Sequence, residues 1–354
     1  MKGRTWPCRS DGSRFSALPS SKINGLKEES RLPMRKISPS SRQIRLSSIS
    51  SSDVHDFSAL PYDVLMKIGG SFSLQNLRAA SLVCKSWAEA LRPLREAMLF
   101  LRWGKRFKHG QGGVRPNLNK ALDSFLKGAA RGSTLAMVDA GLIYWEMGRK
   151  DKAIALYQKA AELGDSAGQC NLAISYLQAE PPNPKGAVKW LYKASLVGHA
   201  RAQYQLALCL HQGRGVDCNM REAHIQEFTA DKFLHLAQAR WYLKAAESGY
   251  VRAMYNVSLC YSFGEGLLHS HRQARKWMKR AADRGHCKAQ FEHGLALFSE
   301  GQMMKAVVYL ELATRAGETA AVHVKNVVLQ HLSATSRDQV MVLADNWRAL
   351  PSSH

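Results

Sequence analysis

A glycine that recurs at nearly constant intervals is the feature that most constrains how this chain can fold. Similar phrases end at Gly132, Gly164, Gly198, Gly249, Gly285 and Gly317, at intervals of 32, 34, 51, 36 and 32 residues. Small residues stand three and four positions before each glycine, and a bulky residue stands seven or eight positions before it. Small side chains allow close helix contacts, and a glycine just past a helix end supplies a left-handed cap. The period therefore predicts a series of helical hairpins.

Each hairpin is expected to have an opening helix and a closing helix, the closing helix being the one that ends at the repeating glycine. Opening helices are indicated by apolar patterns at 167–176, 202–210 and 253–261. Gly-x-Gly loops at 213–215 and 264–266 recur at the same phase between helices, so we interpret them as hairpin turns rather than phosphate-binding loops. A single hairpin cannot cover its apolar face, so stacked hairpins with a concave binding surface are expected.

Five of the closing helices also carry a cation five positions before the glycine. These are Lys127, Lys159, Lys193, Lys244 and Arg280. A cation in the last turn lies near the negative end of the helix dipole, which explains the position. The whole pattern resembles the Sel1-like repeats, which are related to tetratricopeptide repeats. That resemblance covers residues 94–317 and implies an all-α solenoid of about six helical hairpins.

Alignment of the hairpins gives two columns on the opening helices. One column contains Met137, Gln169, Gln203, Met254 and Gln290. The other, which we call the polar column, contains Asp139, Asn171, Gln205, Asn256 and Glu292. We expect the polar column to line the concave face and to contact a protein target. The alternative is an inter-repeat hydrogen-bond ladder with a structural role only.

The interval of 51 residues indicates an insertion in the fourth hairpin. Removal of residues 224–238 joins Ala223 to Ala239 and restores a repeat of the usual length. The inserted residues could form a helical extension, form a loop, or derive from altered splicing. We expect their deletion to leave the melting temperature unchanged.

A separate apolar pattern precedes the repeats, at residues 57–93. Pro61 stands where the first turn of a helix tolerates proline, and apolar residues at 64, 65 and 68 share one face of that helix before Gly69 and Gly70 end it. Helical spacing resumes after residue 74 and continues to Trp87. So small a module exposes much of its apolar surface, so we expect it to dock on a partner.

The Leu-Pro start, the Val-Cys-Lys-x-Trp end and the spacing between them resemble an F-box. The resemblance implies a helical plug that binds the Skp adaptor of a cullin-type ubiquitin ligase. Some of the matching residues must form the module's own core, and a cap on the repeats is the alternative role. The residues implied in adaptor binding are Leu60, Pro61, Val64, Leu65, Ile68, Phe72, Leu74, Leu77, Leu82, Val83, Cys84 and Trp87.

The formal net charge of the chain is +22, and it is unevenly distributed. Residues 1–52 hold 11 Lys and Arg, 3 Asp and Glu, and 14 serines, without apolar periodicity, which predicts a disordered tail. The role of residues 1–52 has three alternatives: a solvated tail that is phosphorylated, an organelle transit peptide, or a nuclear or nucleic-acid contact. At the other end, residues 318–354 are expected to form a helical cap and tail.

The seven cysteines include no CxxC pair, which predicts reduced, buried thiols rather than disulfides. No apolar run approaches the ~20 residues that a membrane helix needs. We therefore expect a soluble protein of the cytoplasm, the nucleus or both, without a membrane partner.

Catalytic and metal-binding motifs are not recognisable in the sequence, so we expect no enzyme activity, no metal and no cofactor. The hypothesis that fits best is a substrate-receptor subunit of an SCF-type ubiquitin ligase. In that role the chain would bind the Skp adaptor, and through it cullin, and would recruit a protein target that the charge suggests is acidic. A non-catalytic scaffold is the alternative. Nucleic acid is disfavoured as a partner, because no basic stripe interleaved with aromatic residues is evident.

Overall fold

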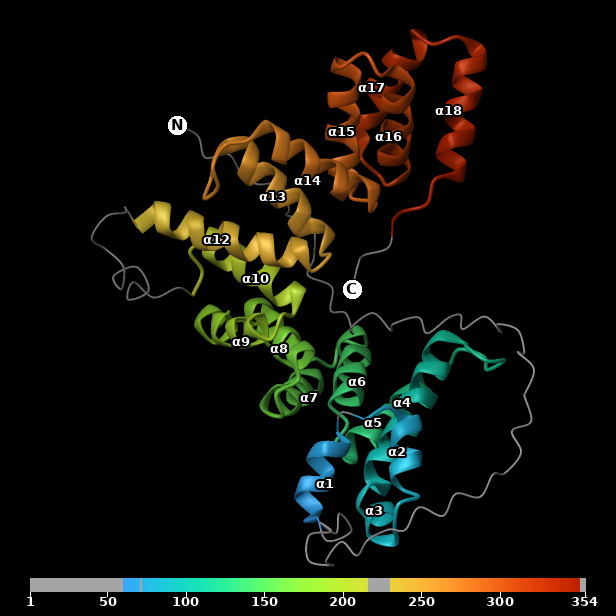
Figure 1. Ribbon diagram of the computed structural model, residues 1–354, viewed down its shortest axis with the longest axis vertical. Coiled ribbons are helices and arrows are strands. Elements are labelled where there is room, and N and C mark those ends of the chain that lie inside the picture. The colour runs from blue at the N-terminus through green and yellow to red at the C-terminus, as the bar shows by residue number, and fades with distance from the viewer. Residues whose placement is uncertain (1–59, 71, 216–229, 351–354) are drawn as a thin grey trace, which may run out of the picture. The chain divides into compact units, whose positions relative to one another are not determined.

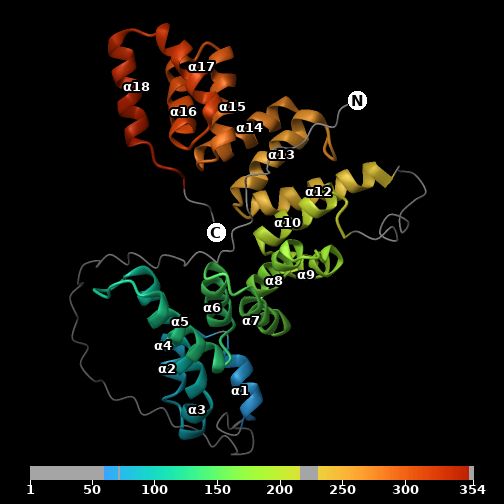
Figure 2. The same ribbon diagram turned by 180° about the vertical axis from the view of Figure 1, so that it is seen from behind.

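The computed structural model of the chain describes residues 60–70, 72–215 and 230–350, and all regular elements within these ranges are helices (Figures 1 and 2). The predicted all-α class is thereby confirmed. The chain divides into two compact units, one ending at Arg149 and the other beginning at Lys150. The predicted disordered tail, residues 1–52, lies outside the described residues.

The described part of the first unit contains six helices. They are α1 (Tyr62–Gly69), α2 (Leu74–Ala80), α3 (Lys85–Ala90), α4 (Arg92–His109), α5 (Leu118–Ala130) and α6 (Thr134–Glu146). The long helix α4 packs along α5 and also contacts α2, α3 and α6.

The short helices α1 to α3 are held by a small apolar core. Leu65, Leu77 and Leu91 are buried and come from α1, α2 and the start of α4. Gly69 is required at the end of α1, because a Cβ there would collide with the side chain of Leu91. The Ser73 hydroxyl accepts a hydrogen bond from the Asn76 amide at 3.2 Å and so caps α2.

The second unit contains the remaining helices. They are α7 (Lys150–Glu162), α8 (Ser166–Gln178), α9 (Pro184–Leu196), α10 (Ala200–His211), α12 (Ala230–Glu247), α13 (Val251–Phe263), α14 (His271–Asp283), α15 (Cys287–Ser299), α16 (Met303–Arg315), α17 (Thr319–Gln330) and α18 (Ala334–Asn346). From α7 to α17 each helix packs on the next one along the chain, so these helices are ordered in space as in the sequence.

The repeating glycines end the closing helices as predicted. Gly164, Gly198 and Gly285 have φ angles of 85°, 86° and 87°, in the left-handed region that favours glycine. The next helix starts two residues later, and its cap is made by the residue directly after the glycine. Asp165 accepts the Gly168 amide through its carboxylate, and His199 accepts the Ala202 amide through Nδ1.

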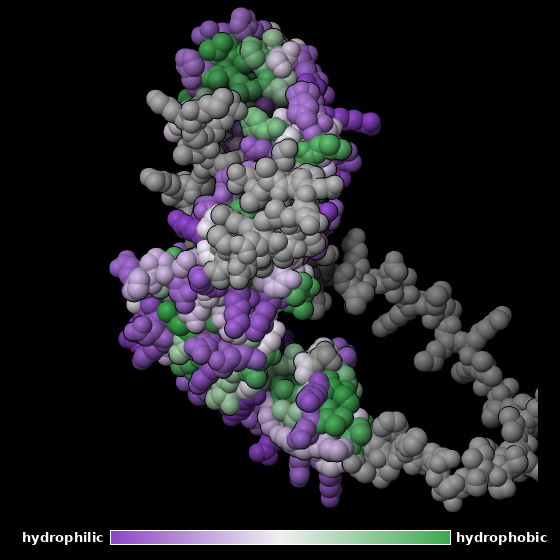
Figure 3. Space-filling view, turned by 90° about the vertical axis from the view of Figure 1, so that its left-hand side faces the viewer, coloured by the Kyte–Doolittle hydropathy of each residue, from purple (hydrophilic) through white to green (hydrophobic). Residues whose placement is uncertain are grey.

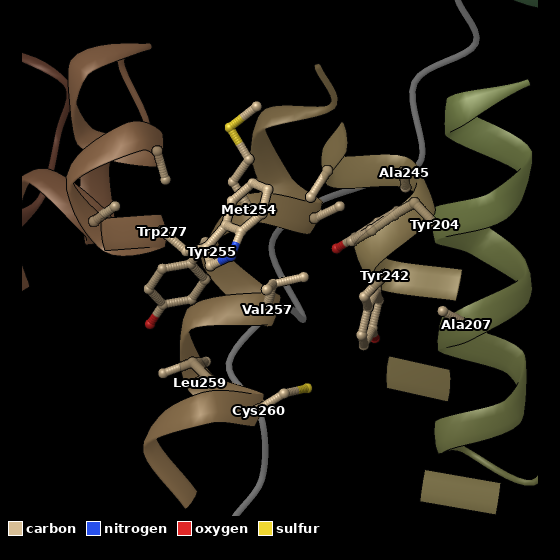
Figure 4. Close-up of a cluster of buried hydrophobic side chains, with 14 of the residues drawn as sticks. Tyr204, Ala207, Tyr242, Ala245, Met254, Tyr255, Val257, Leu259, Cys260 and Trp277 are labelled. Atoms are coloured by element: carbon tan, nitrogen blue, oxygen red, sulfur yellow. The ribbon is translucent and has the colours of Figure 1, made fainter. Parts of the chain in front are cut away.

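The core of the second unit runs on from hairpin to hairpin. Figure 4 shows one section of it, with side chains from α10, α12, α13 and α14 packed together. The rings of Tyr204 and Tyr242 lie 5.7 Å apart between α10 and α12, and Trp277 of α14 belongs to the same cluster. The apolar faces of neighbouring hairpins therefore cover one another, as a solenoid requires.

The packing of two loop glycines locates the insertion in the fourth hairpin. A Cβ at Gly215 would collide with the carbonyl of Pro184, the first residue of α9, and one at Gly266 would collide with the carbonyl of His235 in α12. Pro184 and His235 both stand 14 positions before a repeating glycine. His235 therefore occupies the place of a normal first helical residue, and residues 235–238 belong to the packed array even though the sequence alignment assigned them to the insertion.

Two further helices follow the last repeat. Val328 of α17 and Val340 of α18 join a buried cluster with Val307 and Leu310 of α16. These helices lie where the cap was predicted. Apolar side chains stay exposed on them, including Val342 and Leu343 of α18. Hydrophobic residues gather at the upper end of Figure 3, where the last helices of the chain lie.

Candidate protein-interaction surfaces

The structure divides the predicted adaptor-binding residues into a core set and an exposed set. Leu65 and Leu77 are buried and hold the module together, while Leu60, Phe72, Leu74, Cys84 and Trp87 are half-buried. The exposed members are Pro61, Val64, Ile68, Leu82 and Val83. Tyr62 is exposed as well, although it is not among the predicted adaptor-binding residues. Tyr62 stands one helical turn before Leu65, a residue of the predicted apolar face, and this spacing is the signal that could have identified it.

Leu82 and Val83 are the most exposed of these side chains, at 86% and 61%. They lie in the turn between α2 and α3, and this turn is closed by backbone hydrogen bonds from Leu82 to Ala79 at 3.0 Å and from Val83 to Ala80 at 3.2 Å. Two aliphatic side chains are thus held out towards solvent by an ordered turn. Such an arrangement is unfavourable for an isolated module and suits a docking contact.

Cys84 follows this turn and occupies the position just before α3, where its side chain makes no capping hydrogen bond. It is half-buried, and its Sγ lies 3.0 Å from the Ser86 hydroxyl. The expectation of a buried thiol is therefore corrected here, because a cap position stays partly open to solvent.

Three of the four described thiols of the repeats are buried as expected, whereas Cys287, at the start of α15, is half-buried. Cys170, Cys209 and Cys260 are free and buried. Burial raises the pKa of these thiols to about 12, about 11 and about 12, so the reactive thiolate is disfavoured. Cys8 and Cys218 lie outside the described residues.

The polar column does not form an open surface, which corrects the expectation that it lines a concave face. Asp139, Asn171 and Gln205 are buried, with Asn171 only 1% exposed, and Asn256 and Glu292 are half-buried. The reason is that opening helices are covered on both sides by neighbouring helices, so a polar residue at this position points into the array.

Burial has electrostatic consequences for the two acidic members of the polar column. It raises the pKa of Asp139, although Lys105, Lys108 and His109 of α4 act in the opposite direction. It also raises the pKa of Glu292, whose carboxylate accepts a hydrogen bond from the Tyr255 hydroxyl at 2.7 Å. These groups are costly to charge, which suits a structural role better than recognition at the surface.

The neighbouring column, rather than the polar column for which the sequence left a ladder open, forms hydrogen bonds between repeats. The Nε2 atoms of Gln169, Gln203 and Gln290 donate to carbonyls in the last turn of the preceding closing helix. The acceptors are Ala161, Ser195 and Ala282, at 3.3, 3.2 and 3.2 Å. Each of these carbonyls also accepts the amide of the repeating glycine, at 3.1, 3.1 and 3.0 Å, so the glutamine adds a second hydrogen bond that ties each hairpin to the next.

No group of three or more His, Cys, Asp or Glu side chains that could hold a metal ion occurs among the residues that the structure describes. The rings of His269 and His271 lie 4.4 Å apart. In the described ranges, no helix combines the length and the apolar character that crossing a membrane requires.

Comparison with protein-family models identifies both parts of the chain. An F-box-like model matches residues 57–94. A Sel1 repeat model matches six segments, namely 101–133, 149–165, 166–199, 200–225, 239–250 and 251–286. The gap between the fourth and fifth segments coincides with the insertion.

Solved structures show the same solenoid fold. A protective antigen of uropathogenic Escherichia coli with an SLR fold superposes with a TM-score of 0.58, at 21% identity, over 81% of this chain and 63% of the antigen. A Sel1 repeat protein from Oxalobacter formigenes gives a TM-score of 0.51, at 23% identity, over 70% of this chain and 96% of its own.

Among proteins of known sequence, an F-box protein of Arabidopsis thaliana is 61% identical over 99% of both chains. An exopolysaccharide production negative regulator of Rhizobium meliloti is 27% identical over 50% of this chain and 67% of its own. F-box and Sel1 repeat proteins are typically non-catalytic adaptors. The chain belongs to the F-box protein family and carries its F-box ahead of a solenoid of Sel1 repeats.

Proposed function

We propose that this protein is the substrate-receptor subunit of an SCF-type ubiquitin ligase. In this role the F-box binds the Skp adaptor, and through it cullin, while the repeats recruit a protein target. The observation that carries the proposal is the exposure of Leu82 and Val83 on an ordered turn, beside a module whose core is already closed by Leu65 and Leu77.

The energetics of the exposed pair favour a partner. Burial of one aliphatic side chain contributes about 1.5–3 kcal/mol, so covering Leu82 and Val83 would supply several kcal/mol to an interface. Val64 and Ile68 of α1 are exposed as well and enlarge the apolar area available to the adaptor. The residues that fold the module and those that would bind are therefore different, which allows the two roles to be tested separately.

Ubiquitin transfer in such a complex is carried out by the partner subunits. The receptor contributes by holding the target beside them, which raises the effective concentration of the reacting groups. The buried, free thiols of Cys170, Cys209 and Cys260 fit a reducing compartment, and we infer that the protein acts in the cytosol or the nucleus.

The test is co-purification of the full-length chain with the Skp adaptor. We expect Leu82→Asp with Val83→Asp to reduce adaptor binding by about 30-fold or more, since a charge replaces an aliphatic side chain at the contact. The matched control is Leu196→Asp with Val197→Asp, an adjacent pair on the repeats with exposed fractions of 65% and 70%.

The control pair should leave adaptor binding unchanged, because it lies in the second unit. Equal adaptor binding by the wild type and the Leu82/Val83 variant would refute the proposal. A wild-type chain that binds no adaptor at all would instead indicate a scaffold that acts outside a ubiquitin ligase.

A further inference from the structure

Three successive closing helices carry cations at matching positions. Lys193, Lys244 and Arg280 stand five positions before the repeating glycines of α9, α12 and α14, and Lys189, Arg240 and Lys276 stand nine positions before them. Residues four apart share one face of a helix, so each pair forms a ridge. All six side chains are exposed, and we call them the basic face.

Side chains connect the helices that carry the three ridges. The ring of Tyr192 in α9 packs edge-on against Trp241 of α12, with centroids 6.4 Å apart. Leu243 of α12 and Trp277 of α14 belong to one apolar cluster. The two cations of each ridge stand four residues apart, which is about 6 Å along the helix.

Among the residues that the structure describes, no carboxylate neutralises the charges of the basic face. On α14, Arg275 pairs with Glu300 at 2.7 Å and Lys279 pairs with Asp283 at 2.6 Å. None of the six cations of the basic face forms an ion pair with a described carboxylate. Helix α9 contains no acidic residue at all. The excess positive charge of this region is thus left for a partner.

Three of these cations are held in place by aromatic rings. Lys193, Lys244 and Arg280 lie over the rings of Trp190, Trp241 and Trp277, at 4.4, 4.5 and 4.7 Å from the centroids. A cation over an aromatic face keeps its charge while its side chain loses freedom. Less entropy is then lost when a partner binds.

Helix stability does not explain the basic face. A cation in the last turn interacts favourably with the helix dipole, but the effect falls off within that turn. Lys189, Arg240 and Lys276 stand a turn further back, near the middle of the regular helix. The equivalent positions of α7 and α16 hold Ala155 and Val308, so the feature is confined to three consecutive repeats.

Apolar side chains beside the basic face indicate the class of partner. Tyr192, Leu196 and Val197, at the end of α9, are exposed next to Lys193. A protein segment with acidic and apolar residues matches both features. Single-stranded nucleic acid would need open aromatic faces for stacking, whereas Trp277 is buried and the cations already cover the rings.

We propose that the basic face binds an acidic segment of the target protein, with Leu196 and Val197 receiving its apolar side chains. The identity of this partner as a ligase target rests on the proposed function. The presence of the binding surface does not, because it lies entirely within the second unit.

The proposal is tested with the full-length chain and a labelled peptide that alternates glutamate and leucine. We expect the peptide to bind the wild type. In the triple variant Lys189→Gln, Arg240→Gln and Lys276→Gln, the affinity for the peptide should fall by about 10-fold or more. The matched control is Arg275→Gln with Lys279→Gln and Lys305→Gln. It removes the same charge from exposed positions outside the basic face and should change binding less than about 2-fold.

Several results would overturn the proposal. These are no peptide binding by the wild type, equal weakening by both triple variants, or tighter binding of a single-stranded DNA oligonucleotide than of the peptide. Adaptor binding is measured on the same samples. We expect the Leu82/Val83 variant to lose adaptor binding and keep peptide binding, and the basic-face variant to keep adaptor binding and lose peptide binding. The two measurements therefore test the two proposals independently.

Discussion

The cap of α10 makes the stability of the second unit depend on pH. His199 accepts the Ala202 amide through Nδ1, at 3.1 Å, and only a neutral ring can accept in this way. Burial, together with the nearby Arg201 guanidinium, lowers the pKa of His199 from an ordinary value of 6.5 to about 4. Protonation of this one ring therefore opposes folding.

The pKa of His199 sets both the size and the direction of the effect. A lowering from 6.5 to about 4 corresponds to about 3 kcal/mol of stability. The unfolded chain binds the proton below pH 6.5 and the folded chain only below about pH 4. The contribution is thus fully present above pH 6.5, declines as the pH falls, and is lost near pH 4. Between pH 7 and pH 5 the loss amounts to about 2 kcal/mol.

The substitution that isolates this effect is His199→Asn, because asparagine is a favoured cap residue that does not titrate. Between pH 7 and pH 5 we expect the free energy of unfolding to fall by about 2 kcal/mol less in the variant than in the wild type. The measurement is urea unfolding followed by circular dichroism, with hydrogen exchange of residues 200–211 reporting on α10 itself. As a control, His331→Asn changes an exposed histidine and should keep the wild-type pH dependence. An unchanged pH dependence in His199→Asn would refute the reasoning.

Three further predictions concern the repeat architecture. Gly215→Ala should destabilise the chain by about 1–3 kcal/mol more than Gly213→Ala in thermal melts, since both residues have positive φ but only Gly215 faces a carbonyl. Gln203→Met should change stability by less than about 1.5 kcal/mol, because Met254 already fills the same column position; a larger loss would show that the ladder bond is essential. Deletion of residues 224–238 should leave the melting temperature unchanged, because it moves Ala223 into the buried position that Ala274 fills in the next hairpin. A lowered melting temperature would show that this position requires the native Gln238.

The architecture was predictable because it depends on backbone chemistry that few residues can supply. A glycine with φ near 85° ends Lys150–Glu162 and its counterparts, and no other residue type adopts that angle readily. The spacing from Leu60 to Trp87 is similarly restrictive, since it combines a helix start, a glycine stop and an apolar face. Such signals are local, so they can be seen without the fold.

The faces of the helices were harder to predict because they depend on neighbours. Gln169 and Asn171 are both polar, and both are buried. Only the fold shows that the Gln169 side chain reaches the carbonyl of Ala161 in the neighbouring helix. A polar residue in an opening helix is therefore poor evidence for an open surface. The helix dipole is a sufficient explanation for the cations five positions before the glycines. It gave no reason to look for the further cations nine positions before them, such as Lys189 and Lys276.

The two proposed interfaces differ in physical character, and salt should separate them. The exposed part of the F-box is apolar, so its attraction for a partner depends little on ionic strength. The basic face would act through exposed charges, whose reach falls from about 10 Å at 0.1 M salt to about 3 Å at 1 M. High salt should therefore release an acidic target while the adaptor stays bound. Co-elution of both partners in 1 M salt would show that contacts other than the basic face hold the target.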